Sequence, residues 1–275
     1  MRTGNRSSVA RLDLPMLRRL FYTFYREFQA RYYFQQYMGF ECVDSGMIDG
    51  VLGNDIDAAV FWRLRKDNVW PIDTNYSQYT EDDLFDIVEL LYDCVSKPIE
   101  GWYHQYNGCG WHYDTYDQDA GQKEFRAKIN QLLFDYRDGY ELSEAGEILE
   151  SGQPWAASLL NAKIPSYDPV NVEARLEAAI LKFRRRGTPI EDKRDAVRDL
   201  AGVLEFLRPK LKHVFNSKDE SDLFNIANNF SIRHHGQQQK RDYDLAIWCS
   251  WMFYFYLATI HAALRLIQRH EATGP

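Results

Sequence analysis

The chain has 275 residues, enough for one large domain or two smaller ones that each bury an apolar core. Apolar residues make up 45% and charged residues 27%, which excludes an intrinsically disordered chain. The net charge of −7 excludes a uniformly basic surface, but residues 166–275 carry 17 basic and 14 acidic side chains, against 16 and 26 in residues 1–165. We therefore expect any site for a polyanion in the second half.

The pattern of apolar residues is helical almost throughout. In the first half it predicts helices over 16–38, 54–65, 81–95 and 122–136. Thr80-Glu81-Asp82-Asp83 has the sequence of a capping box, and Asn54 or Asp55 is a suitable N-cap for the preceding helix. Glycines in the segments 46–53 and 101–110 predict loops, and the second segment is rich in aromatic residues. The segment 140–148 is the best candidate for a β-hairpin.

Glycines and prolines between Ser151 and Pro169 indicate a boundary, so we expect domains over 1–165 and 166–275. The second half predicts four helices with short turns between them, which favours an antiparallel bundle. Their ranges are 170–186, 190–215, 218–233 and 243–269. The expected fold class is all-α, with a helical N-terminal region that bears a small β-hairpin and a C-terminal helical bundle.

The segment Leu245 to Leu264 contains no charged residue and is long enough to span a bilayer. It also contains His261, two tryptophans and two tyrosines, and no comparable second segment exists, so we favour a buried bundle helix. The N-terminus shows no signal sequence, and the four cysteines form no CxxC pair. These features predict a cytoplasmic protein with reduced thiols.

His104, Cys109 and His112 lie within nine residues of each other and carry side chains that ligate zinc. No fourth ligand is evident, and the surrounding loop is rich in tryptophan and tyrosine. We therefore favour structural packing of this loop and expect neither a metal site nor a cofactor.

The richest group of titratable residues is Asn228-Asn229-Phe230-Ser231-Ile232-Arg233-His234-His235-Gly236, at the end of a predicted helix. A neutral imidazole can take a proton from a ribose 2′-hydroxyl, and an imidazolium can return one to the leaving oxygen. A neighbouring guanidinium can stabilise charge on the phosphate. The alternative is that these residues cap the helix and hydrogen-bond the following loop.

This segment, together with the long aromatic helix that follows, resembles the HEPN domains of abortive-infection and toxin proteins. The resemblance covers about residues 168–269. It implies a small helical bundle that dimerises and, in many members, a metal-independent ribonuclease with an Arg-x(4–6)-His motif. Here no arginine occupies the family position, where Asn228 stands instead. Arg208 and His213 match the spacing, but Pro209 and the helical context indicate a chance match.

The resemblance implies a ribonuclease effector or toxin of bacterial antiphage defence. His234 would be the principal acid and base, and His235 a second imidazole or positioning group. Arg233 would stabilise the phosphate, and Asn228 and Asn229 would orient it. The rival hypothesis is a non-catalytic HEPN-like interaction or regulatory subunit, which the missing arginine favours. A third is an effector that acts on membranes through residues 245–264, although we expect no membrane association.

Basic residues near the proposed site predict contacts with RNA phosphates. Lys240 and Arg241 follow the histidines directly, whereas Arg184, Arg185 and Arg186 close a helix, where cations are also favoured by the helix dipole. The aromatic stripe of Trp248, Trp251 and Phe255 has the spacing of a core or subunit contact, which favours a homodimer. The acidic N-terminal region would bind a protein partner, sense a trigger or restrain the bundle.

Overall fold

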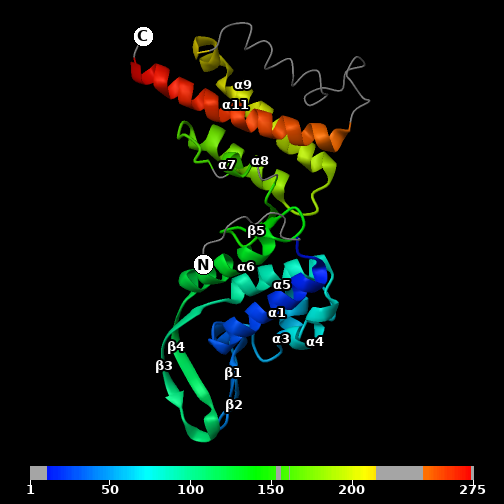
Figure 1. The fold of residues 1–275 in the computed structure, drawn as a ribbon. Coiled ribbons are helices and arrows are strands. Elements are labelled where there is room, and N and C mark those ends of the chain that lie inside the picture. Colours follow the sequence, from blue (N-terminus) through cyan, green and yellow to red (C-terminus); the bar gives the residue numbers. More distant parts are fainter. Residues whose placement is uncertain (1–10, 153–155, 161, 215–243, 274–275) are drawn as a thin grey trace, which may run out of the picture. The chain divides into compact units, whose positions relative to one another are not determined.

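The computed structural model describes residues 11–152, 156–160, 162–214 and 244–273. The chain forms two compact units, Met1–Ser151 and Gly152–Pro275, each with its own apolar core. The domain ranges expected from the sequence were 1–165 and 166–275. The described residues are mostly helical, with small antiparallel hairpins (Figure 1). The first unit therefore contains more β-structure than the single hairpin we expected.

Helices α1, α5 and α6 form the core of the first unit. On α1, aromatic residues spaced by three and four positions face the core, since Phe21, Tyr25 and Phe28 are buried. The helical elements of this unit are α1 (Leu14–Ala30), α2 (Gln35–Met38), α3 (Ile56–Leu64), α4 (Ile72–Asn75), η1 (Tyr76–Gln78), α5 (Glu81–Cys94), η2 (Tyr106–Gly108) and α6 (Gln118–Phe134). The strands pair as β1 (Phe40–Cys42) with β2 (Gly46–Ile48), β3 (Lys97–His104) with β4 (Gly110–Asp117), and β5 (Tyr140–Leu142) with β6 (Ile148–Glu150).

Several local predictions are confirmed. Thr80 and Asp83 form a reciprocal capping box at the start of α5, and Asp55 caps α3 by accepting a hydrogen bond from the Ala58 N–H. The hairpin of β5 and β6 lies where alternation around Gly146 predicted it. Each of these signals depends on residues close together in the chain, and this is why the sequence alone was sufficient.

The single helix expected over 16–38 is wrong, because α1 ends at Ala30 and a turn separates it from α2. Tyr32 adopts a left-handed φ of 63°. Its N–H donates to the Gln29 carbonyl at 2.9 Å, and the Tyr33 N–H donates to the Phe28 carbonyl at 3.1 Å. This is the hydrogen-bond pattern of a Schellman cap, in which the left-handed position is usually glycine. A tyrosine there left no stop signal in the sequence.

The loop expected over 101–110 is also wrong, because strands β3 and β4 form the longest hairpin among the described residues. This hairpin extends away from the helices of the first unit (Figure 1). Gly101 lies opposite Tyr113, and a Cβ at Gly101 would collide with the backbone of His112 and the Tyr113 ring. The glycine interrupts the apolar pattern but permits the close pairing of the two strands.

The segment 46–53, expected to be a loop, contains strand β2, which pairs with β1 in a short hairpin. Gly39, between α2 and β1, has a φ of 74°, and a Cβ there would collide with the carbonyl oxygen of Ile48. Only glycine permits this approach, so the chain can turn sharply from α2 into the hairpin. The turn places Cys42 at the end of β1.

The second unit is a helical cluster around one apolar core. In Figure 1, α9 and α11 lie side by side over much of their length. The expected helix over 218–233 lies outside the described residues, so the four-helix HEPN bundle stays a prediction. The described elements are α7 (Ala157–Leu160), the π-type turn η4 (Pro169–Glu173), α8 (Ala174–Arg184), α9 (Ile190–Val214) and α11 (Leu245–Thr273).

Helix α11 contains the long apolar segment. Among the described residues it is the one helix whose length and composition, over 245–272, would allow a membrane crossing. It is also the helix that packs most extensively on α9, and Met252, Phe253 and Leu257 are buried in the core of this unit. In the aromatic stripe, Trp251 contacts Trp248 edge-on and stacks on Phe255, and its side chain is partly exposed.

Candidate metal centre

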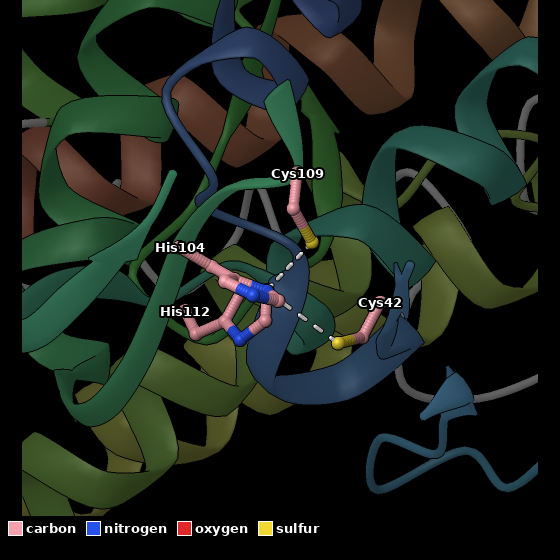
Figure 2. A group of neighbouring side chains, drawn as sticks. All are labelled: Cys42, His104, Cys109 and His112. Atoms are coloured by element: carbon pink, nitrogen blue, oxygen red, sulfur yellow. Dashed lines mark hydrogen bonds between the residues drawn. The ribbon is translucent and has the colours of Figure 1, made fainter. Parts of the chain in front are cut away.

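Four side chains with metal-binding atoms converge where the β1–β2 and β3–β4 hairpins of the first unit meet. Cys42 comes from the end of β1, His104 from the end of β3, and Cys109 and His112 from the connection into β4 and from β4 itself. Figure 2 shows all four pointing toward one another. Their sulfur and nitrogen atoms all lie within 4.8 Å of one another.

These separations are close to those of a tetrahedral zinc site. The Cys109 sulfur lies 3.1 Å from Nε2 of His112, and the Cys42 sulfur lies 3.8 Å from Nδ1 of His104. With Zn–S bonds of about 2.3 Å and Zn–N bonds of about 2.0–2.1 Å, tetrahedral ligand atoms lie roughly 3.3–3.8 Å apart. Small movements of side chains would therefore complete the coordination shell. Two thiolates and two imidazoles are a ligand set that zinc prefers.

The side chain of Gln35 holds His112 in position. Its Nε2 donates to the Trp111 carbonyl, and its Oε1 accepts from the Tyr113 N–H, both at 2.9 Å. Tyr116 also donates its hydroxyl hydrogen to the same Oε1 at 3.1 Å. His112 lies between the two bonded residues of β4, so its backbone is fixed on both sides by a buried amide.

Asp44 holds the ring of His104. Its carboxylate lies 3.1 Å from Nε2 of His104, on the side of the ring opposite the nitrogen that faces Cys42. A carboxylate in this place fixes the orientation of the ring and the tautomer that leaves Nδ1 free to ligate. The arrangement is the outer shell typical of histidines that bind zinc.

The surroundings favour the protonation states that a metal needs. A hydrogen bond from the backbone of Asp44 lowers the pKa of the Cys42 thiol to about 7, although burial opposes it. Burial, and to a smaller extent His104, lower the pKa of His112, so its neutral form is favoured. Thiolate and neutral imidazole are the forms that bind a divalent cation.

Aromatic rings shield the cluster. Phe40 lies 4.4 Å from His112 between ring centres, and Trp102 lies 4.6 Å from His112 and 5.2 Å from His104. Cys42 and His112 are each only 6% exposed. A site enclosed in this way has low solvent access and four protein ligands, as structural zinc sites do.

Sequence reasoning missed Cys42. It found the other three residues because they lie within nine positions, whereas Cys42 lies 62 positions before His104. No spacing rule links a cysteine at that distance to the hairpin. A prediction of the β1–β2 and β3–β4 hairpins with the contact between them would have been needed to find it.

The residues expected for RNA cleavage and for phosphate contact after the histidines lie outside the described residues, so their arrangement stays a prediction. They are Asn228, Asn229, Arg233, His234, His235, Lys240 and Arg241. The other three predicted phosphate contacts lie at the end of α8, where Arg184 is buried, Arg185 is exposed and Arg186 is half-buried. Arg208 and His213 both lie inside α9, as does Pro209.

No family model, curated protein or solved structure matches this chain. The chemistry of the cluster is therefore inferred from its own ligands, distances and surroundings.

Proposed function

We propose that the first unit is a zinc-binding module in which one Zn²⁺ is held by Cys42, His104, Cys109 and His112. The convergence of four donor atoms within 4.8 Å carries this proposal. Because all four positions of a tetrahedral ion would be taken by protein, the ion would be structural and would leave no open position for a substrate.

The ion would join two hairpins that have little core of their own. Most side chains of β2 and β3 are exposed, and short two-stranded hairpins are marginally stable in water. Zinc would link β1 to both ends of the connection between β3 and β4, which supplies the stability that apolar packing lacks there. A rigid hairpin held in this way is suited to recognition.

The test is the zinc content and the spectrum of the full-length protein. We expect one zinc per chain, and cobalt substitution should give the visible and sulfur-to-cobalt absorption bands of a tetrahedral thiolate site. Cys42→Ala and His112→Ala should each lose the metal. Cys249→Ala and His270→Ala, at positions in the second unit, are the matched controls and should keep it. Zinc content below one-tenth per chain after refolding with Zn²⁺ would refute the proposal.

We further propose, as a second function, that the C-terminal unit is a HEPN-like bundle acting as a metal-independent ribonuclease in antiphage defence. The sequence resemblance and the helical fold of α8, α9 and α11 around one core support this proposal. His234 and His235 would move protons, Arg233 would stabilise the phosphate, and the active form would be a dimer. Asn228 at the family's arginine position favours the alternative, a non-catalytic interaction subunit.

Cleavage of total RNA in the presence of EDTA tests this second function. We expect cleavage to persist under chelation and to be lost in His234→Ala, while His213→Ala, a histidine on α9, should cleave normally. Cys42→Ala separates the two proposals, because it should lose zinc without touching the nuclease residues. Full cleavage by His234→Ala would contradict the catalytic assignment, and absence of cleavage in every variant would favour the interaction subunit.

A further inference from the structure

Three aromatic residues of the β3–β4 hairpin, Tyr103, Trp111 and Tyr113, form a continuous row of rings with Tyr32 from the turn after α1. The ring centres of Tyr103 and Trp111 lie 5.7 Å apart, those of Trp111 and Tyr113 lie 5.5 Å apart in a stacked arrangement, and those of Tyr113 and Tyr32 lie 5.6 Å apart. Tyr103 is 53% exposed and Trp111 is 39% exposed. We call these four residues the aromatic row.

The aromatic row borders a pocket of about 260 Å³ next to the metal centre. Tyr32, Phe34, Phe40 and Trp111 line it, together with Glu41, which contributes the one charged side chain of the lining. Pockets for drug-sized ligands measure roughly 300–1,000 Å³. This pocket is smaller, so its size suits one side chain of a polypeptide.

The charged side chains in the sequence around this pocket are mostly acidic. Residues 32–62 and 98–122, which contain the metal ligands and most of both hairpins, hold nine acidic residues and no lysine or arginine, and Lys97 at the start of β3 pairs with Glu124 at 2.7 Å. The cations that precede this stretch on α1 and its cap are already engaged, Arg26 with Asp73 at 2.9 Å and Arg31 with Glu124 at 3.1 Å. The electrostatic field therefore favours a cationic ligand and opposes a nucleic acid.

Aromatic rings and carboxylates together are the chemistry that recognises guanidinium groups. Arginine stacks on aromatic faces and is only weakly hydrated, and tryptophan is the best such partner. The first unit already contains contacts of this kind, since the guanidinium carbon of Arg65 lies 4.1 Å from the Trp62 ring centre and that of Arg31 lies 4.5 Å from the Tyr33 ring centre. The pocket presents a tryptophan, a tyrosine and an exposed glutamate to an incoming side chain.

We propose that this pocket receives an arginine side chain from an extended basic segment of a partner protein, with the aromatic row as the surface along which the segment lies. This rests on the proposed zinc-binding function only in that Cys109 is shared by the metal centre and the pocket wall. The metal would hold the wall in place, and the rings would make the contact.

The experiment measures binding of a labelled nine-residue peptide with alternating arginine and glycine to the full-length protein by fluorescence anisotropy. The matched peptide replaces each arginine with citrulline, which keeps the shape and removes the charge. We expect the arginine peptide to bind at least about tenfold more tightly. Trp111→Ala should weaken that binding about tenfold, and Trp111→Phe should restore part of it. Glu41→Gln should weaken it and reduce its dependence on salt.

Trp62→Ala is the control, because Trp62 is an exposed tryptophan outside the aromatic row and one face of its ring contacts Arg65. This variant should bind the peptide like the wild type. Equal binding of both peptides, or unchanged binding by Trp111→Ala with an unchanged circular dichroism spectrum, would overturn the proposal. Displacement of the peptide by a single-stranded RNA oligonucleotide would also overturn it. Zinc is measured on the same samples, so failure of peptide binding by zinc-loaded protein rejects the pocket alone, and absence of zinc rejects the metal centre.

Discussion

Asp44 shows how one residue outside the ligand set can control the metal centre. Its carboxylate lies 3.1 Å from the His104 nitrogen that faces away from Cys42. The contact costs little, because Asp44 remains largely exposed, yet it decides which nitrogen of His104 carries the proton. The orientation of the ring and the nitrogen that is free to bind the metal both depend on that choice.

Asp44→Asn should therefore weaken zinc affinity roughly 10- to 100-fold while one zinc per chain still binds at saturation. An asparagine can keep one hydrogen bond but presents either an amide oxygen or an amide nitrogen to the ring, so it holds the tautomer of His104 less firmly than a carboxylate does. Competition with a chromophoric chelator measures the affinity. Asp49→Asn, at an exposed carboxylate after β2, is the control, and an effect of equal size there would show that only the net charge matters.

The four ligand residues also show what a sequence can reveal about a site. His104, Cys109 and His112 were recognisable because their spacing is local, but three ligands did not justify a metal site. Cys42 reaches the cluster because Gly39 allows the sharp entry into β1 and because residues of β1 contact His104 on β3 and His112 on β4. This contact between distant segments belongs to the tertiary structure, and no local sequence pattern predicts it.

At the scale of elements, a cluster around Glu124 joins α1, β3 and α6. Lys97 lies 2.7 Å and the Tyr33 hydroxyl 2.5 Å from its carboxylate, and Arg31 lies 3.1 Å away. Hydrogen bonds from Lys97 and then from Tyr33 and Arg31 lower the pKa of Glu124 to about 2 from an ordinary value of 4.5. The cluster holds the base of the long hairpin to the helical core.

Because the folded-state pKa of Glu124 is depressed, its contribution to the free energy of unfolding is present above about pH 4.5 and is lost as the pH falls toward 2. Urea unfolding at pH 6 and pH 3 should show that Glu124→Gln destabilises the protein more at pH 6 than at pH 3. Asp57→Asn, at an exposed carboxylate on α3, is the control. A difference between wild type and Glu124→Gln that does not change with pH would contradict this account.

The capping box of α5 gives a prediction that depends on local structure alone. Thr80→Ala removes the hydroxyl that accepts from the Asp83 N–H at 3.1 Å, so unfolding in urea should become easier by about 1 kcal/mol. Thr23→Ala changes an exposed threonine in the interior of α1 and should change stability by less than about 0.5 kcal/mol. Equal losses in the two variants would show that the cap contributes nothing of its own.

Two elements show why some of the fold was predictable and some was not. The start of α5 was recognised because Thr80 and Asp83 are three residues apart, the spacing at which the two side chains cap each other's backbone N–H groups. The β3–β4 hairpin was interpreted as a loop because glycines interrupt residues 101–110, and large rings on both faces hide the alternation of a strand. Trp102 faces the histidines while Tyr103 and Trp111 form the aromatic row, so apolar and polar residues do not alternate. Its stability depends on contacts with Gln35, Cys42 and Tyr32, which come from elsewhere in the chain.

At the scale of the whole molecule, the two units have separate cores and only the first holds the proposed zinc. Calorimetry of the full-length protein should therefore show that chelation lowers the transition of the first unit and leaves that of the second unchanged. A zinc ion present at 1,000 times its dissociation constant contributes about 4 kcal/mol, which corresponds to a shift on the order of 10 °C. His112→Ala should unfold at the lower temperature with or without chelator. Equal shifts of both transitions would contradict a site confined to the first unit.

The division of charge follows the same two units and separates their roles. The acidic first unit presents rings and carboxylates, and the proposed ribonuclease residues belong to the more basic second half. A ligand attracted to one should be repelled by the other. An arginine-rich partner and an RNA could therefore bind the same chain without competing.

The amide of Gln35 has a consequence for how the protein behaves in concentrated solution. A free strand edge exposes unpaired backbone groups that invite pairing with another molecule and fibril growth, above all where large rings are exposed beside it. On β4, the Trp111 carbonyl and the Tyr113 N–H are already satisfied by a side chain that imitates a peptide group. Gln35 thus covers the edge of β4 at these two groups, beside the exposed rings, where a strand of another molecule would otherwise find a donor and an acceptor.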